Sequence, residues 1–106
     1  MIVISRQADG INIEGHAGFA PSGKDIVCAG VSTLVTNLVN SIEELTEDTI
    51  EYETGDGYII IKHGNLSEGA SLLVDSFLLG IEEISTNYPQ YVGLKKECNK
   101  DGKNDI

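Results

Sequence analysis

The most chemically informative stretch of the sequence places a histidine, His16, ahead of a glycine-containing segment and a cysteine, Cys28. Apolar residues at helical spacing follow Cys28, which predicts that its thiol lies in the first turn of a long helix. The unpaired N–H groups and the dipole of a helix amino terminus stabilise an anion placed there. A nearby imidazole can take the thiol proton, as in other Cys–His sites. The pattern therefore predicts nucleophilic chemistry by His16 and Cys28.

Three neighbours of Cys28 are expected to support this chemistry. The N–H groups of Cys28 and Ala29 are candidate donors to the oxyanion of a tetrahedral intermediate. Ser32 lies one turn further on the same helix face, where its hydroxyl either orients His16 or, as is commoner for a helical serine, bonds back to the preceding turn. Asp25 either caps the helix by accepting the Cys28 N–H or orients the histidine as the acid of a triad does. The preference for aspartate at helix N-caps favours capping.

The direction of the histidine side chain conflicts with simple strand geometry. Strict alternation puts His16 on the face of Asn12 and Glu14, opposite the isoleucines of the same strand. If those isoleucines face the helices, His16 points away from Cys28. A bend or bulge at Gly15 would resolve this conflict by re-aiming the histidine.

The residues around the pair predict the elements that must position it. Alternating apolar and β-branched runs joined by Asp9-Gly10 and Gly55-Asp56-Gly57 predict two hairpins, and two apolar stripes of helical period predict two long helices. The expected elements are a strand over 1–7, a strand over 11–14, a helix over 25–46, strands over 49–54 and 58–63, a helix capped by Asn65 or Ser67, and a strand over 88–94. The fold expected is α+β and two-layered, with both helices packed on one face of a mainly antiparallel sheet of about five strands.

The length and the charge of the chain indicate the broad class of protein to which it belongs. The chain has 106 residues, which predicts one domain; we place it at residues 1–95, followed by a polar carboxyl-terminal tail at 96–106. Seventeen acidic residues against seven basic ones give a net charge of −10, which disfavours direct nucleic-acid binding and favours either a basic partner or simply solubility. The short apolar runs and the polar start predict a cytoplasmic protein that does not bind membranes.

Other chemistries lack the residues they need. Cys28 and Cys98 are too few for a disulfide framework, so reduced thiols are expected, with Cys98 idle in the tail. His63 has no second histidine or cysteine beside it to complete a zinc set, and neither a metal nor a cofactor is expected. A thiol redox motif is missing, and a cysteine phosphatase would need an arginine after the cysteine, whereas the sole arginine is Arg6.

The run from residue 15 to residue 32 resembles the signature of the ribosomal-processing cysteine proteases: Gly-His-Ala, a short loop with glycine, then Asp-Ile-Val-Cys-Ala and a nearby Val-Ser. The likeness in length, element order and acidic character covers about residues 1–95. It implies a catalytic dyad of His16 and Cys28, and it puts the family's characteristic aspartate on Asp25. It also implies a homodimer that trims an amino-terminal extension, ending in paired phenylalanines, from a large-subunit ribosomal protein.

The same resemblance implies a mobile loop between the two catalytic residues that closes over substrate. Gly18, Phe19 and Gly23 are the expected substrate-loop residues, with Phe19 placed to cover an aromatic side chain. Because folds host unrelated functions, a catalytically idle ribosome-associated binding or assembly module is the alternative to the protease.

Overall fold

The computed structural model describes residues 1–18, 20–21 and 25–96. The elements in chain order are β1 (Ile2–Gln7), β2 (Gly10–Glu14), α1 (Ile26–Leu45), β3 (Glu51–Gly55), β4 (Tyr58–Lys62), α2 (Glu68–Asn87) and β5 (Val92–Lys96). All seven predicted elements are present, with ends that differ by a few residues from those expected. The largest difference is the start of β5, which begins at Val92 because the segment before it, with Pro89, forms a turn.

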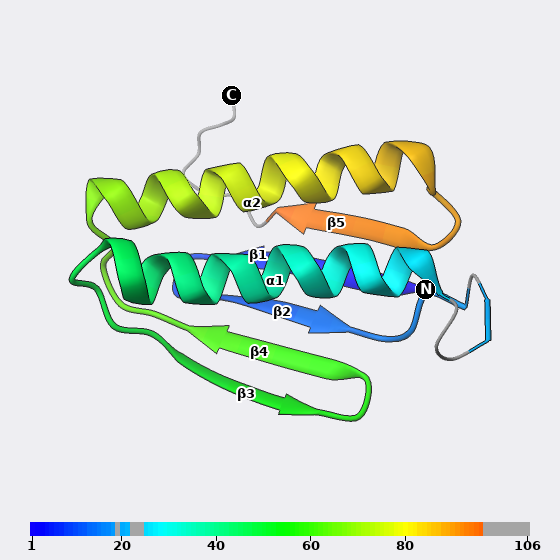
Figure 1. Ribbon diagram of the computed structural model, residues 1–106, viewed down its shortest axis with the longest axis horizontal. Helices are drawn as coiled ribbons and strands as arrows, with labels where there is room; N and C mark the ends of the chain where they lie inside the picture. Colours follow the sequence, from blue (N-terminus) through cyan, green and yellow to red (C-terminus); the bar gives the residue numbers. More distant parts are fainter. Residues whose placement is uncertain (19, 22–24, 97–106) are drawn as a thin grey trace.

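The strands form one sheet in the order β3-β4-β2-β1-β5. Three neighbouring pairs are antiparallel, and only β1 and β5 run parallel. Both helices lie on the same face of this sheet (Figure 1), and no helix within the described residues covers the opposite face. The predicted α+β fold with two helices on one face of a mainly antiparallel sheet is therefore confirmed.

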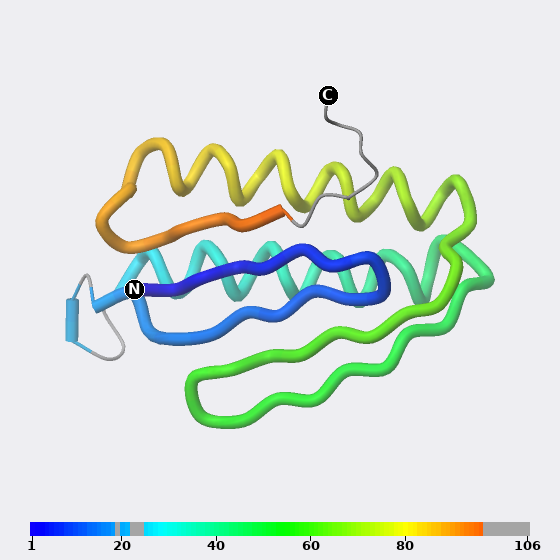
Figure 2. Tube along the Cα trace, turned by 180° about the vertical axis from the view of Figure 1, so that it is seen from behind, coloured from blue at the N-terminus to red at the C-terminus, as the bar shows by residue number. Residues whose placement is uncertain are grey.

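Alternation along the strands separates a buried face from an open one. The residues that point towards the helices are isoleucines and valine with almost no exposed surface, namely Ile2, Ile4, Ile11, Ile13, Ile61 and Val92. Figure 2, seen from behind, shows the central strands β1 and β2 running between β5 and the β3–β4 hairpin. β1 and β2 therefore hold the middle of the core, and β3 forms one free edge of the sheet.

Helix α1 begins and ends at identifiable caps. The Asp25 side chain accepts the N–H of Cys28, and the Thr46 hydroxyl donates to the Ile42 carbonyl at 2.6 Å. By length and composition alone α1 could cross a membrane. Its buried stripe, however, packs into the core as expected of a core helix: Val27, Val31, Val35, Leu38, Val39 and Ile42.

Helix α2 is capped by Ser67, one of the two expected residues, whose hydroxyl accepts the Ala70 N–H at 3.1 Å. The following strand β5 reaches Lys96, the first residue of the expected tail, and Lys96 Nζ pairs with Glu82 Oε2 at 2.6 Å. Residues 97–106, which include Cys98, lie outside the described part of the chain.

Candidate active site

Cys28 lies in the first turn of α1, as its spacing predicted. Its own N–H donates to Asp25 Oδ1 at 2.9 Å, so Asp25 takes the capping role that the sequence favoured. The Ala29 N–H donates to the Asp25 carbonyl at 3.1 Å. Both N–H groups expected to bind an oxyanion are therefore engaged within the helix terminus, and the structure does not support that role for them.

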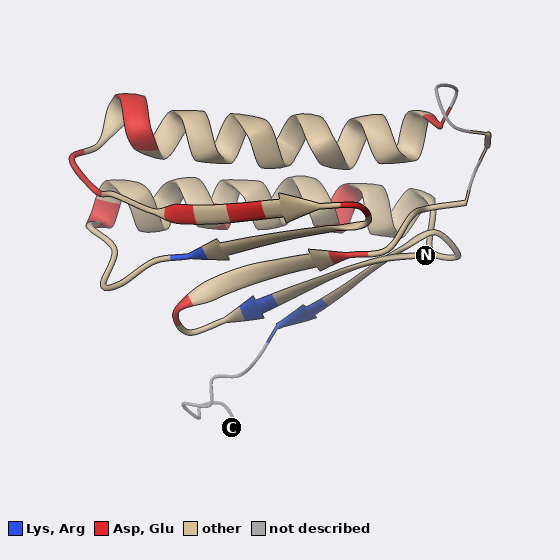
Figure 3. Cartoon of the chain, turned by 90° about the horizontal axis from the view of Figure 1, so that it is seen from below, with Lys and Arg blue, Asp and Glu red and all other residues tan. Residues whose placement is uncertain are grey.

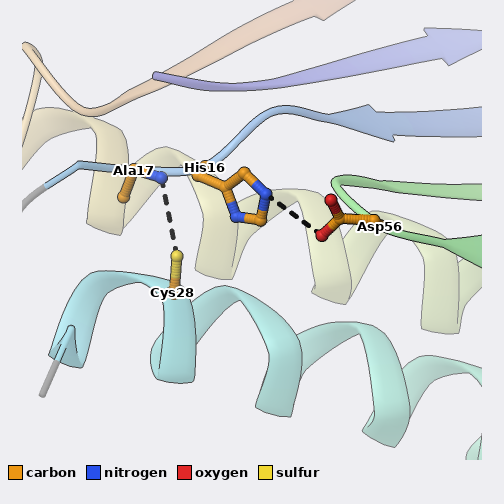
Figure 4. Close-up of polar contacts among 4 residues, drawn as sticks. All are labelled: His16, Ala17, Cys28 and Asp56. Atoms are coloured by element: carbon orange, nitrogen blue, oxygen red, sulfur yellow. Dashed lines mark hydrogen bonds and ion pairs between the residues drawn. The ribbon is translucent and has the colours of Figure 1, made fainter. Parts of the chain in front are cut away.

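A different backbone donor faces the sulfur. The N–H of Ala17 donates to Cys28 Sγ at 3.5 Å (Figure 4). Ala17 itself is buried in the core, which holds its peptide group in place beside α1. The sequence analysis missed this donor, because the turn that brings residue 17 against α1 is a tertiary feature.

His16 is turned towards the helix side by a bend at Gly15. Gly15 has φ +100°, a conformation that side chains with a Cβ rarely adopt, and a Cβ there would collide with the Met1 carbonyl oxygen. The Gly15 N–H donates to the Gly57 carbonyl at 2.7 Å, and the Met1 amino group donates to the His16 carbonyl at 2.6 Å. The bend that would resolve the conflict is therefore present, and it breaks the alternation that would have aimed His16 away from Cys28.

The imidazole of His16 lies beside the turn between β3 and β4. Its Nε2 atom is 3.6 Å from Asp56 Oδ1, and both side chains are largely exposed, at 69% and 100%. A Cβ at Gly57 would lie 3.2 Å from the same nitrogen, so a glycine in the turn lets the ring approach. Figure 4 shows the ring directed towards Asp56. Among the described residues no hydrogen bond joins His16 to Cys28.

One pocket of 240 Å³ brings these groups together. Its lining residues come from β1, β2, α1 and the β3–β4 hairpin: Ile2, Ile13, Gly15, His16, Cys28, Val31, Ser32, Gly55, Gly57, Tyr58 and Ile59. The apolar floor and the few polar groups that converge on it are typical of a small-molecule or peptide site.

Ser32 lies at this pocket and is exposed. In the described part of the chain its hydroxyl makes no hydrogen bond, so the expected bond to the preceding turn is absent. The hydroxyl instead remains available to a ligand on the same helix face as Cys28.

The hairpin supplies site residues that sequence reasoning missed. Tyr58 lines the pocket, and its hydroxyl donates to Glu53 Oε2 at 3.2 Å. The negative charge of Glu53, that hydrogen bond and a small desolvation raise the pKa of Tyr58 above its usual 10. The turn itself was predicted, but its position beside His16 depends on the pairing of Glu14 with Tyr58 across β2 and β4.

The remaining predicted residues lie elsewhere. Gly18 adopts φ +73° with open space around it, whereas Phe19 and Gly23 lie outside the described residues.

His63 lines no part of the Cys28 pocket: its Nε2 atom lies 3.1 Å from Nη1 of Arg6. Desolvation of the half-buried Arg6 guanidinium lowers its pKa, against the opposing effects of Asp75 and Asp9.

A cysteine at a helix amino terminus and a histidine share one pocket on a small two-layer α+β domain, an arrangement that fits a cysteine protease. Residues 1–93 match the family described as cysteine protease Prp. The chain therefore belongs to that family.

Relatives of known name agree with this assignment. The ribosomal processing cysteine protease Prp of Staphylococcus aureus is 31% identical over 85 residues, which cover 77% of this chain and 80% of the relative. Its namesake from Bacillus subtilis is 31% identical over 81 residues, covering 70% of this chain and 72% of the relative.

Solved structures share the fold. The crystal structure of the S. aureus protease with a covalently linked product peptide superposes with a TM-score of 0.83 at 25% identity, covering 91% of this chain and 97% of the other. The structure of SMU.848 from Streptococcus mutans superposes with a TM-score of 0.75 at 35% identity, covering 90% of each chain.

Proposed function

We propose that this protein is an endopeptidase that removes the amino-terminal extension of a large-subunit ribosomal protein, cutting after aromatic residues through an acyl-enzyme. The observation that carries the proposal is the shared pocket of Cys28 and His16, with the Ala17 N–H on the cysteine sulfur. The S. aureus relative is named a ribosomal processing protease, and its structure holds a covalently linked product peptide.

In the first half-reaction Cys28 is the nucleophile and His16 the base. His16 takes the Sγ proton, and the thiolate attacks the carbonyl carbon of the scissile bond to form a tetrahedral oxyanion. The Ala17 N–H, 3.5 Å from Sγ in the resting pocket, stabilises the thiolate before attack. Collapse of the intermediate breaks the C–N bond, and His16 returns its proton to the leaving amine.

In the second half-reaction water replaces the amine. His16 takes a proton from water, the resulting hydroxide attacks the thioester carbon, and Cys28 leaves as the thiolate and is reprotonated. The products are a free carboxylate on the extension and a mature amino terminus. His16 passes the proton it took from water to Cys28, and the new carboxylic acid releases its own proton to the solvent. No co-reactant other than water is needed.

The resting pocket is not yet arranged for proton transfer. His16 is directed towards Asp56, 3.6 Å away, and makes no hydrogen bond to Cys28 among the described residues. Catalytic hydrogen bonds are often long or absent without substrate and form only in the complex. We assign to the substrate the displacement of the exposed imidazole towards the sulfur.

The charge of the chain suits a basic partner. Acidic residues lie on β3 and in the turn that follows it (Figure 3), beside the pocket of His16 and Cys28. A net charge of −10 accelerates encounter with a basic protein segment and repels nucleic acid. The proposal includes a homodimer that works in the cytoplasm without a cofactor or metal, and without direct contact to nucleic acid or membrane.

The test is cleavage of a synthetic peptide that carries the extension with its paired phenylalanines. Mass spectrometry is expected to find one cut after an aromatic residue with the native protein and none with Cys28→Ala or His16→Ala. The two losses should not add in the double variant, because the residues act as one unit. Binding of the peptide without any cut by the native protein would favour the idle binding module instead.

A further inference from the structure

Three aspartates of the chain directly precede a glycine, at Asp9-Gly10, Asp56-Gly57 and Asp101-Gly102. Such a pair can close into a ring, because glycine has no Cβ to hinder the approach of its nitrogen to the aspartate side chain. The product is a five-membered succinimide, which water reopens mainly to isoaspartate. The structure describes the first two pairs, whereas Asp101-Gly102 lies outside the described residues.

The backbone of the Asp9-Gly10 pair is held in place at both residues. Gly10 is buried at the start of β2, with β1 on one side and β4 on the other. The Asp9 carbonyl accepts the His63 N–H at 2.9 Å, and the Gly10 carbonyl accepts a hydrogen bond from Arg6 Nη1 at 3.1 Å. A backbone fixed in this way cannot bend into a five-membered ring, so we expect no ring closure at Asp9.

The reacting groups of Asp56-Gly57 are not held in this way. The pair forms the turn between β3 and β4, the Asp56 side chain is fully exposed, and within the described residues no hydrogen bond holds the Gly57 N–H. The imidazole of His16 lies beside both residues (Figure 4): its Nε2 atom is 3.6 Å from Asp56 Oδ1, and a Cβ at Gly57 would lie 3.2 Å from the same nitrogen. A nitrogen base therefore lies next to the carboxyl and the amide that would react.

We propose that Asp56-Gly57 is a self-modification site, which isomerises to isoaspartate with His16 as proton carrier and thereby inactivates the protease. The Gly57 nitrogen attacks Cγ of the Asp56 carboxyl, protonated from the solvent, and a C–N bond forms. His16 Nε2 takes the N–H proton and returns it to the departing hydroxyl, which leaves as water. A second water then adds to the backbone carbonyl of Asp56 and breaks its bond to the Gly57 nitrogen. The product has the mass of the starting chain, and water is the sole co-reactant.

The product removes two supports of the catalytic histidine. The Gly57 carbonyl accepts the Gly15 N–H at 2.7 Å, and Gly15 makes the bend that aims His16. Isoaspartate adds one carbon to the backbone of this two-residue turn, which should move the Gly57 carbonyl away from Gly15. It also replaces the side-chain carboxylate that faces His16 with a carboxylate attached directly to Cα. The resulting loss of cleavage rests on the proposed function, whereas the isomerisation itself does not.

Site-resolved analysis of stored protein tests the modification. Native protein is kept at physiological temperature and neutral pH for several weeks and then digested with trypsin, which places Asp9, Asp56 and Asp101 in separate peptides. A second protease that cuts before aspartate, but not before isoaspartate, should fail to cut before position 56 in a growing fraction of chains. It should cut before position 9 throughout. A resistant fraction no larger at position 56 than at position 9 would overturn the proposal.

The role of His16 is measured from the rate of isomerisation and not from cleavage. His16→Ala should form isoaspartate at position 56 at least about tenfold more slowly, because a positioned general base contributes about a hundredfold or more. His16 is largely exposed, so its replacement should leave the fold intact. The matched control is His63→Ala, at the other histidine, which lines no part of the Cys28 pocket. Equal rates at position 56 in the two variants would contradict the proposal.

Cleavage shows the consequence for the enzyme. Modified chains, separated by chromatography, should cleave the peptide with paired phenylalanines at least about tenfold more slowly than unmodified chains of the same sample, because misplacing a catalytic group by about 1 Å can cost about a hundredfold. Asp56→Glu would need a six-membered ring, which closes more slowly, so this variant should keep its own initial rate during storage. Equal cleavage by modified and unmodified chains would refute the inactivation.

Hydrogen exchange gives a second measurement that needs no turnover. The amide of Gly15, followed by NMR, should exchange faster in the modified chains, because its bond to the Gly57 carbonyl is lost. Unchanged exchange at Gly15 would show that the bend survives the modification, and the inference would be wrong. Fresh native protein that failed to cleave the peptide would count against the proposed function alone, because isoaspartate and exchange are both measured without substrate.

Discussion

The Nε2 atom of His16 lies 3.6 Å from the Oδ1 atom of Asp56, a residue of the β3–β4 turn that is distant from it in sequence. The contact exists because Gly15 bends the chain and because Gly57 leaves space for the ring. The carboxylate faces the ring nitrogen from the turn, and we expect Asp56 to act as a positioning residue for His16.

Replacing Asp56 by asparagine should reduce kcat by less than about tenfold and leave KM unchanged. The effect is small because the carboxylate is fully exposed and therefore screened by solvent. Peptide cleavage measured at low and high salt checks this. The native enzyme should approach the Asp56→Asn rate at 1 M salt, where the screening length is about 3 Å. Glu44→Gln, an equal charge change at the exposed carboxyl-terminal end of α1, should behave as the native protein. A loss in Asp56→Asn as deep as that of His16→Ala would contradict the positioning role.

Asp25 should tolerate asparagine but not alanine. Its carboxylate accepts the Cys28 N–H at 2.9 Å, and asparagine caps a helix about as well as aspartate. Asp25→Ala should lower the free energy of unfolding by about 1 kcal/mol, measured by urea denaturation, while Asp25→Asn stays close to native. If Asp25→Asn abolished peptide cleavage with stability intact, Asp25 would have to orient His16.

Gly15→Ala should damage both stability and turnover. An alanine there must adopt φ +100° and would collide with the Met1 carbonyl oxygen, at a cost of about 1–3 kcal/mol for the strained backbone alone. Relief of the collision should also move His16 and slow cleavage. Gly64→Ala is the matched control, because its added Cβ would meet nothing within 4 Å. Equal unfolding midpoints for the two variants would show that the bend is not required.

Removing the charge of Glu53 should lower the pKa of Tyr58. The carboxylate of Glu53 disfavours the nearby phenolate and accepts the Tyr58 hydroxyl, and both effects raise the pKa of Tyr58 in the native protein. Glu53→Gln should bring that pKa back towards 10. Titration followed by absorbance at the phenolate band measures it, with Tyr58→Phe identifying the residue's contribution. An unchanged titration of Tyr58 in Glu53→Gln would refute the charge effect.

Local patterns were sufficient for most of the fold. Periodicity located both helices, and turn residues such as Asp9-Gly10 located the hairpins to within a few residues. Capping chemistry identified Asp25 and limited the cap of α2 to Asn65 or Ser67, of which the structure has Ser67. These features were predictable because each depends on residues close together in sequence.

The missed parts of the site depend on contacts across the sheet. Asp56 reaches His16 only because β2 pairs with β4 in the register that sets Glu14 opposite Tyr58. The Ala17 N–H reaches Cys28 only because residue 17 packs into the core. Neither strand register nor core packing can be read from a few neighbouring residues. The oxyanion donors expected from the sequence are therefore local ones, the N–H groups of Cys28 and Ala29. In the structure the side chain and the carbonyl of Asp25 already accept these two N–H groups.

The free edge of β3 carries a further consequence for solubility. An unpaired strand edge is a template on which other chains can add, and β3 is exposed along its whole length. Glu51 and Glu53 place negative charge on that edge, so two molecules that approach through β3 repel each other before backbone hydrogen bonds form. These two glutamates thus oppose edge-to-edge association of the protein through β3.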